Sequence, residues 1–278
     1  DADRSYTVEF GDFAVTSKLV NIDVPGYGQP TKNRLRLFDL ASVDDGLVPG
    51  SSIDFDKTEI AKNLTLFLYP DDSDEQGRLL RIYQEYFMVS NAAQLLIDEA
   101  VERGSNLHDL ADYAVVQIND THPALVIPEL MRILMDDAGL DWDTAWNITT
   151  HSVAYTNHTV LSEALERWPQ ELMQSLLPRV WTIITEIARR YQEKIENYYH
   201  DEAKTREMAI IWDGQVRMAN LCIAGGMAVN GVSALHSDIL RNDVFKYQCA
   251  MEPEKFKNVT NGIDHRRWLA QINPRLDE

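Results

Sequence analysis

The spacing of apolar side chains changes along this chain and separates a strand region from a helical region. Residues 5–40 alternate apolar and polar positions in short runs, and Pro25–Gly28 interrupts them. Alternation with a period of two is typical of half-buried strands, and a Pro-Gly pair favours a turn. We therefore predict a small β region over residues 1–45 and a loop from Ser42 to Ser52.

Helical spacing follows this region. Apolar residues at intervals of three and four predict a helix over 79–100 that stops at Gly104, and a second helix that runs to Asp137. Pro128 suits the first turn of that second helix. A third, long helix is predicted from Pro178 to about residue 200.

Short apolar runs lie between these helices, at residues 113–118 and 153–155, and after the last of them, at residues 221–224. Strands that alternate with helices predict an α/β fold with a mainly parallel sheet covered on both faces. Repeats, low-complexity tracts and linkers are missing from the sequence. We therefore predict one domain over residues 1–278.

Each of the three apolar runs ends in small or polar residues: Asn119–His122, Thr156–Thr159 and, less clearly, Gly225-Gly226. Neighbouring parallel strands would bring these residues to one edge of the sheet, where open α/β sheets bind their ligands. Two structural alternatives stay open. Asp120 could cap the turn before Pro123, and His158 could be a core histidine with satisfied hydrogen bonds.

The charge of the chain narrows the classes of partner. The formal net charge is −18, and such a surface repels nucleic acid and anionic lipid but accepts neutral sugars. An apolar run of the roughly 18 residues that span a bilayer is missing, and so is a signal peptide. Cys222 and Cys249 lack a Cys-x-x-Cys spacing, which predicts reduced thiols in a cytoplasmic protein. The chain begins without Met and reads as a piece of a longer protein.

The sequence lacks the motifs of several kinds of catalytic site. His122 and His158 do not have the close spacing of a helix-borne metal pair, so we predict no metal site. A Gly-x-Ser-x-Gly nucleophile motif is missing as well. The acidic loop 69–75 has two interpretations, a solvated cap of the following helix or a gate that hydrogen-bonds a polyhydroxyl ligand.

Residues 119–132, Asn-Asp-Thr-His-Pro-Ala-Leu-Val-Ile-Pro-Glu-Leu-Met-Arg, closely resemble a stretch of the α-glucan phosphorylases, which act on glycogen, starch and maltodextrin. Other segments resemble the same family and follow in the family's order, at residues 154–160, 163–169, 221–225, 229–232 and 260–263. The resemblance covers most of the chain and is loose only before residue 60.

This resemblance implies a glycosyltransferase that moves the terminal glucosyl unit of an α-1,4-glucan to phosphate with retained configuration, giving glucose 1-phosphate. It implies two Rossmann-like lobes around a cleft, pyridoxal phosphate in the second lobe, and a homodimer. The chain is similar to the larger part of the first lobe. The cofactor's lysine and the basic residues that hold phosphate have no counterpart here, so we expect no bound cofactor and no activity from the chain alone.

The resemblance also implies residue roles. His158 would be the catalytic position, with its side chain on the glucose 6-hydroxyl and its backbone carbonyl facing the cationic anomeric centre. Asn261 would share the 6-hydroxyl, and Val232 would pack against the C6 edge of the sugar. The full set of substrate-binding positions is Asp120, His122, Thr159, Val232, Asn261, Asp71, Asp72 and Ser73. The last three would belong to a mobile gate, where family members often carry asparagines.

A second hypothesis is a stand-alone carbohydrate-binding or regulatory module that kept this lobe and lost the chemistry. Measurable glucan affinity in a chain that is complete at these boundaries would support it.

Overall fold

The computed structural model describes residues 4–44, 63–66 and 70–278. The predicted β region is present as an antiparallel sheet in the order β1 (Ser5–Glu9), β2 (Ala14–Pro25) and β3 (Lys32–Asp44). β3 continues through residues 42–44, where the sequence predicted a loop, because these residues pair with the start of β2. The rest of that predicted loop lies outside the described residues.

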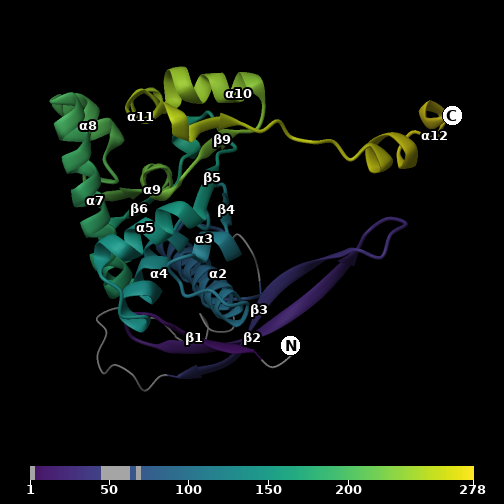
Figure 1. Cartoon of the computed structure of the whole chain (residues 1–278), viewed down its shortest axis with the longest axis horizontal. Coiled ribbons are helices and arrows are strands. Elements are labelled where there is room, and N and C mark those ends of the chain that lie inside the picture. The colour runs from purple at the N-terminus through teal and green to yellow at the C-terminus, as the bar shows by residue number, and fades with distance from the viewer. Residues whose placement is uncertain (1–3, 45–62, 67–69) are drawn as a thin grey trace.

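A four-stranded sheet forms the centre of the molecule (Figure 1). Its strands are β4 (Val116–Asn119), β5 (Val153–Thr156), β9 (Val229–Gly231) and β10 (Phe256–Asn258). Every neighbouring pair is parallel, in the order β10-β9-β5-β4. The predicted α/β class with a parallel sheet is confirmed.

The predicted long helices are present. They are α2 (Glu75–Glu102), α4 (Val126–Arg132) with its π-helical continuation Ile133–Asp137, and α7 (Pro178–Tyr199). Asp74 caps α2, since its carboxylate accepts a hydrogen bond from the Gly77 N–H at 2.7 Å. Gly104 follows the end of α2 with a φ of 104°, a conformation that glycine adopts without strain.

Shorter elements complete the chain. The α-helices are α3 (Leu110–Tyr113), α5 (Trp142–Ser152), α6 (Gln170–Leu176), α8 (Glu202–Met208), α9 (Met218–Gly225), α10 (Ala234–Ile239), α11 (Lys246–Met251) and α12 (Pro274–Asp277). Short π-helices lie at Leu240–Val244 and Arg266–Gln271, and 3-10 helices lie at Ser162–Ala164 and Pro253–Lys255. A small antiparallel sheet has the order β6 (Arg167–Pro169), β8 (Gln215–Arg217) and β7 (Ile211–Trp212). All helices of the described residues are too short or too polar to cross a membrane.

Two predicted strands are corrected. Residues 221–224 belong to helix α9, in which all eight residues are buried. A helix that is apolar all round has no amphipathic period, so its sequence resembles that of a buried strand. The strand of this region is β9, which begins at Val229. Likewise, Tyr113 ends helix α3, and the strand predicted from residue 113 begins at Val116.

Helix α4 lies in the middle of the core. Ile127, Leu130 and Met131 are completely buried there. Helix α9 approaches α4 so closely that a Cβ atom on Gly225 would lie 2.7 Å from two side-chain atoms of Ile127. Glycine at this position therefore permits the close packing of the two helices.

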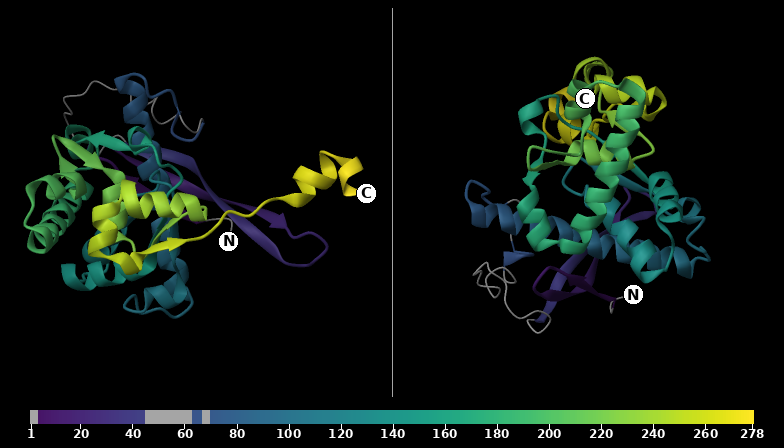
Figure 2. Two further views of the ribbon diagram at one scale, coloured as in Figure 1. Left: turned by 90° about the horizontal axis from the view of Figure 1, so that it is seen from above. Right: turned by 90° about the vertical axis from the view of Figure 1, so that its left-hand side faces the viewer.

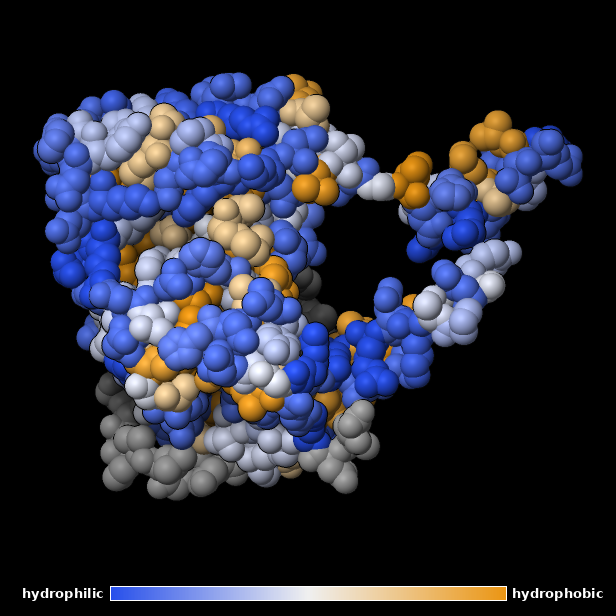
Figure 3. All heavy atoms as spheres, in the orientation of Figure 1, coloured by the Kyte–Doolittle hydropathy of each residue, from blue (hydrophilic) through white to orange (hydrophobic). Residues whose placement is uncertain are grey.

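The hairpin of β2 and β3 and the segment after β10 both extend away from this body in the same direction (Figures 1 and 2). Their far ends meet, because the Arg266 guanidinium lies 4.6 Å from the centre of the Tyr27 ring. The space-filling view shows an opening enclosed between them (Figure 3).

A buried ionic group joins α2 to α4. The Glu129 side chain is completely buried and accepts hydrogen bonds from Tyr86 Oη at 2.6 Å and Ser90 Oγ at 2.9 Å. Arg132 donates to the same carboxylate at 3.0 and 2.6 Å. A buried carboxylate that is paired and fully hydrogen-bonded holds both helices, whereas removal of one partner leaves a buried charge unpaired.

We predict that Glu129→Ala lowers the free energy of unfolding by about 3–5 kcal/mol, because Arg132, Tyr86 and Ser90 lose their common acceptor. Chemical denaturation followed by tryptophan fluorescence measures this change. Glu193→Ala is the matched control, since Glu193 pairs with Arg189 on the exposed face of α7 and should cost much less. Equal effects of the two substitutions would contradict the role of the buried group.

Candidate functional site

The register of the parallel strands brings their polar ends together. Asn119 of β4 pairs with Thr156 of β5, and Thr156 pairs with Asn230 of β9. The Thr156 hydroxyl donates to Asn230 Oδ1 at 2.8 Å, and the Asp120 N–H donates to the Thr156 carbonyl at 2.9 Å. The residues that follow each strand therefore stand along one edge of the sheet.

His158 lies at this edge and is exposed. Its Nε2 atom is hydrogen-bonded to Oδ1 of Asn119. Because an amide oxygen can only accept, the imidazole donates from Nε2, and the neutral ring then carries a lone pair on Nδ1. His158 is thus oriented by the end of β4 and can accept a hydrogen bond from a ligand hydroxyl.

Val232 and Asn261 lie at the ends of β9 and β10. The Asn261 N–H donates to the Val232 carbonyl at 2.8 Å, so the two predicted sugar contacts are held to each other. Thr159 follows His158, and its N–H donates to Oδ1 of Asn157 at 3.0 Å. These four predicted residues occupy the carboxyl edge of the sheet.

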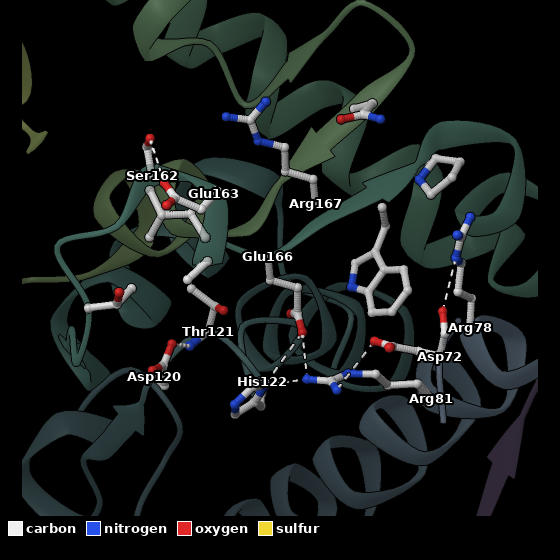
Figure 4. Close-up of a pocket in the computed structure, with 16 residues that line it drawn as sticks. Asp72, Arg78, Arg81, Asp120, Thr121, His122, Ser162, Glu163, Glu166 and Arg167 are labelled. Carbon is white, nitrogen blue, oxygen red and sulfur yellow. Dashed lines mark hydrogen bonds and ion pairs between the residues drawn. The ribbon is translucent and has the colours of Figure 1, made fainter. Parts of the chain in front are cut away.

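A cavity of about 730 Å³ opens beside this edge (Figure 4). Four of the predicted residues line it: Asp72, Asp120, His122 and Thr159. His158, Val232 and Asn261 are not among its lining residues, and neither are Asp71 and Ser73. His158, Val232 and Asn261 therefore form a sheet-edge group, and Asp72, Asp120 and His122 form a cavity group. Thr159 belongs to both groups, whereas Asp71 and Ser73 belong to neither.

Asp120 both shapes the turn after β4 and faces the cavity. Its φ of 63° is an uncommon conformation that Asp tolerates better than most residues. Its Oδ1 accepts from the Thr121 N–H at 2.7 Å, as expected for a turn residue. Its side chain also lines the cavity.

The acidic loop before α2 caps the helix, and one of its residues also lines the cavity. Asp74 caps the helix, and Oδ1 of Asp71 accepts from the Ser73 N–H at 3.0 Å. Asp72 points toward the cavity, with its carboxylate 3.7 Å from Arg81 Nη1 (Figure 4). Only this member of the predicted gate contributes to the cavity lining.

An ionic cluster that the sequence did not reveal lies in the wall of the cavity. Arg81 of α2 lies 3.2 Å from Glu85 Oε1, 3.3 Å from Glu166 Oε2 and 3.0 Å from His122 Nδ1. The Glu85 and Glu166 side chains are only 9% and 10% exposed. In the sequence, Arg81 and Glu85 look like part of an ordinary charged helix face, and only their burial distinguishes them. Glu166 directly precedes β6 and stands in one of the family-like segments.

The two carboxylates of this cluster have opposite protonation tendencies. Burial, together with the negative charge of Glu166, raises the pKa of Glu85 well above its usual value. Burial also opposes ionisation of Glu166, but hydrogen bonds from His122 and Glu85 and the charge of Arg81 lower its pKa. The surroundings therefore favour the neutral form of Glu85 and the ionised form of Glu166.

His122 Nδ1 lies 3.4 Å from Glu166 Oε2 as well as 3.0 Å from Arg81. It accepts from Arg81 when the ring is neutral and donates to Glu166 when the ring is protonated. The interaction with Glu166 raises the pKa of His122 above its usual 6.5, against burial and the charge of Arg81.

The ligand atoms of Glu85, His122 and Glu166 lie within 4.8 Å of one another, which is a spacing that a metal ion can use. The Arg81 guanidinium stands among them within 3.3 Å of each and supplies the positive charge. A divalent ion would have to displace Arg81. We therefore interpret the group as an ion-paired wall of the cavity.

We predict that the pKa of His122, followed by NMR titration, falls in Glu166→Gln because the carboxylate that favours the imidazolium is lost. The raised pKa of His122 also determines how the stability of the fold changes with pH. Protonation of His122 stabilises the fold below about pH 6.5, and this stabilisation is lost as the pH rises through the raised pKa. Glu163→Gln, a neighbouring cavity position, should leave the His122 titration in place, and an equal shift there would contradict the assignment.

The comparisons with known proteins agree over nearly the whole chain. A family model described as carbohydrate phosphorylase matches residues 2–278. The maltodextrin phosphorylase of Streptococcus pneumoniae serotype 4 is 58% identical over 273 residues, which are 98% of this chain and 35% of that protein. The glycogen phosphorylase of Chlamydia pneumoniae is 44% identical over 276 residues, covering 95% of this chain and 33% of that protein.

The muscle form of glycogen phosphorylase from Homo sapiens is 42% identical over 273 residues, covering 92% of this chain and 32% of that protein. The chain thus spans about a third of the length of the curated relatives it matches. A match of this extent, together with the parallel sheet and its polar edge, shows that the chain belongs to the carbohydrate phosphorylase family.

Proposed function

We propose that this chain is part of the first lobe of an α-1,4-glucan phosphorylase, which transfers the terminal glucosyl unit of a glucan to phosphate with retention and releases glucose 1-phosphate. The observation that carries the proposal is the shared edge of β4, β5 and β9, which holds His158 and Val232 beside a cavity of about 730 Å³. Membership of the family supports the reaction.

In this proposal the sheet edge binds the glucosyl unit. His158, oriented through Asn119, accepts a hydrogen bond from the 6-hydroxyl, and Asn261 holds the same hydroxyl. Val232 packs against the C6 edge of the sugar. The His158 carbonyl faces the anomeric carbon, where positive charge develops, and a fixed dipole there lowers the barrier without reorganisation.

The cavity group binds the rest of the glucan. Its lining contains the carboxylates of Asp72, Asp120, Glu163 and Glu166, and carboxylates accept hydrogen bonds from sugar hydroxyls. Glu166 suits this role because its carboxylate lines the cavity and is held there through Oε2 by Arg81 at 3.3 Å and His122 at 3.4 Å.

The family depends on pyridoxal phosphate, which needs a lysine to bind covalently. The lining of the cavity contains no lysine among the described residues. The partly buried Lys255 is engaged by the Ile223 carbonyl at 3.0 Å and by Glu252 at 3.3 Å. These residues do not fit the cofactor, so we assign it, with the phosphate-binding groups, to the part of the protein beyond this chain.

The complete protein is expected to act as a homodimer in the cytoplasm, and we propose both on the basis of the family. The isolated chain is expected to be inactive, because the groups that handle phosphate lie elsewhere. Release of glucose 1-phosphate from maltodextrin by a longer version, and not by this chain, would support this reading. A longer version that binds glucan without phosphorolysis would favour the binding-module hypothesis.

We predict that His158→Ala in the longer protein lowers kcat/KM for glucose 1-phosphate by about tenfold, the value of one hydrogen bond to a substrate hydroxyl. The variant should also distinguish glucose 1-phosphate from its 6-deoxy analogue less well than the unmodified protein does. His151→Ala, an exposed position near the end of α5, is the control. Unchanged discrimination in His158→Ala would contradict the contact with the 6-hydroxyl.

A further inference from the structure

His236 is hydrogen-bonded to the residues that follow β5 and β9. It lies in the first turn of α10, whose cap is Ser233, with Oγ accepting from the His236 N–H at 3.1 Å. The imidazole reaches back to the strand ends. Nδ1 accepts from the Val232 N–H at 3.0 Å, and Nε2 lies 3.0 Å from Oδ1 of Asn157.

These two contacts determine the tautomer of the imidazole. The Val232 N–H can only donate, so Nδ1 must carry a lone pair, and the proton of the neutral ring is on Nε2. That proton points at an amide oxygen, which can only accept. Both ring nitrogens therefore have complementary partners in the neutral Nε2–H form.

Asn157, which directly follows β5, links His236 to that strand. It is completely buried, and its Nδ2 donates to Tyr155 Oη at 3.0 Å while its Oδ1 also accepts from the Thr159 N–H at 3.0 Å. Its own N–H donates to the Asn230 carbonyl at 3.0 Å. His158 lies between Asn157 and Thr159 in the chain, so its backbone is held on both sides.

Helix α10 packs closely on the sheet. This packing fixes the backbone position from which the His236 side chain extends. A Cβ atom on Gly231 would lie 2.6 Å from Ser237 Oγ and 2.9 Å from the Ser237 backbone. The Ser237 hydroxyl donates to Asn258 Oδ1 of β10 at 2.7 Å. Close approach to β9 and a hydrogen bond to β10 leave α10 little room to move.

We propose that His236 is a positioning residue of the glucosyl site, held as the neutral Nε2–H tautomer, and that it sets the backbone of Val232 and His158 relative to each other. The effect extends to Asn261, because its N–H donates to the Val232 carbonyl. The kinetic part of this inference rests on the proposed function, whereas the tautomer assignment rests on geometry alone.

The tautomer is tested first, by ¹⁵N NMR of the complete protein labelled at histidine. Protonated and unprotonated ring nitrogens resonate at well-separated frequencies. The His236 signals, assigned by their loss in His236→Gln, should show a proton on Nε2 and a lone pair on Nδ1. A proton on Nδ1 would overturn the assignment, whatever the enzyme does.

The kinetic role is tested with three substitutions in the complete phosphorylase. His236→Asn places an amide oxygen where Nδ1 stands and keeps the Val232 contact. His236→Gln places an amide nitrogen where Nε2 stands and keeps the Asn157 contact. His236→Ala keeps neither and should lower kcat/KM for glucose 1-phosphate by about tenfold or more, with Asn and Gln in between.

Asp238→Ala, an exposed change on the same helix, is the control, and circular dichroism verifies that each variant is folded. An active parent whose His236→Ala variant stays within about twofold of it would overturn the positioning role. So would a variant series in which Asn and Gln lose as much as Ala. A parent that shows no phosphorolysis would count against the proposed function instead, and the NMR result would stand independently.

Discussion

The parallel pairing of β4, β5 and β9 is the constraint on which the rest of the site depends. Parallel strands run in the same direction, so their carboxyl ends must lie at one edge. The pairing of Asn119 with Thr156, and of Thr156 with Asn230, sets that edge to within one residue. A shift by one residue would turn every side chain to the opposite face and would separate His158 from Asn119.

The two groups of site residues differ in their physical character. The sheet-edge group is neutral and is held by backbone and amide hydrogen bonds around Asn157 and His236. The cavity group is ionic, and the buried acids Glu85 and Glu166 stay compatible with the core because Arg81 pairs with both. A neutral edge suits a sugar ring, and a wall of carboxylates suits the hydroxyls of a longer glucan.

Several features could be predicted because they depend on local patterns. The helix over 79–100 and the long helix from Pro178 follow from regular spacing of apolar residues, and the structure places both within a few residues. The segment 221–224 could not be assigned, because α9 is buried on all sides and lacks a period. The resemblance of the motif placed Asp120 and His122 at a cleft, and both line the cavity. Arg81 and Glu85 could not be found, because exposed and buried charges look alike in a sequence. His236 could not be found either, because its partner Asn157 is distant in the chain.

The sequence by itself determined the α/β class, the family and the residues at the strand ends. These features depend on periodicity and on long motifs, which are formed by residues close together in the chain. Only the tertiary structure decided that His158 and Val232 stand on a neutral edge while His122 stands in an ionic wall. It also decided that one imidazole joins Val232 to Asn157, residues 75 positions apart in the chain. Distant segments form hydrogen bonds and bury each other's side chains only once the strands have paired.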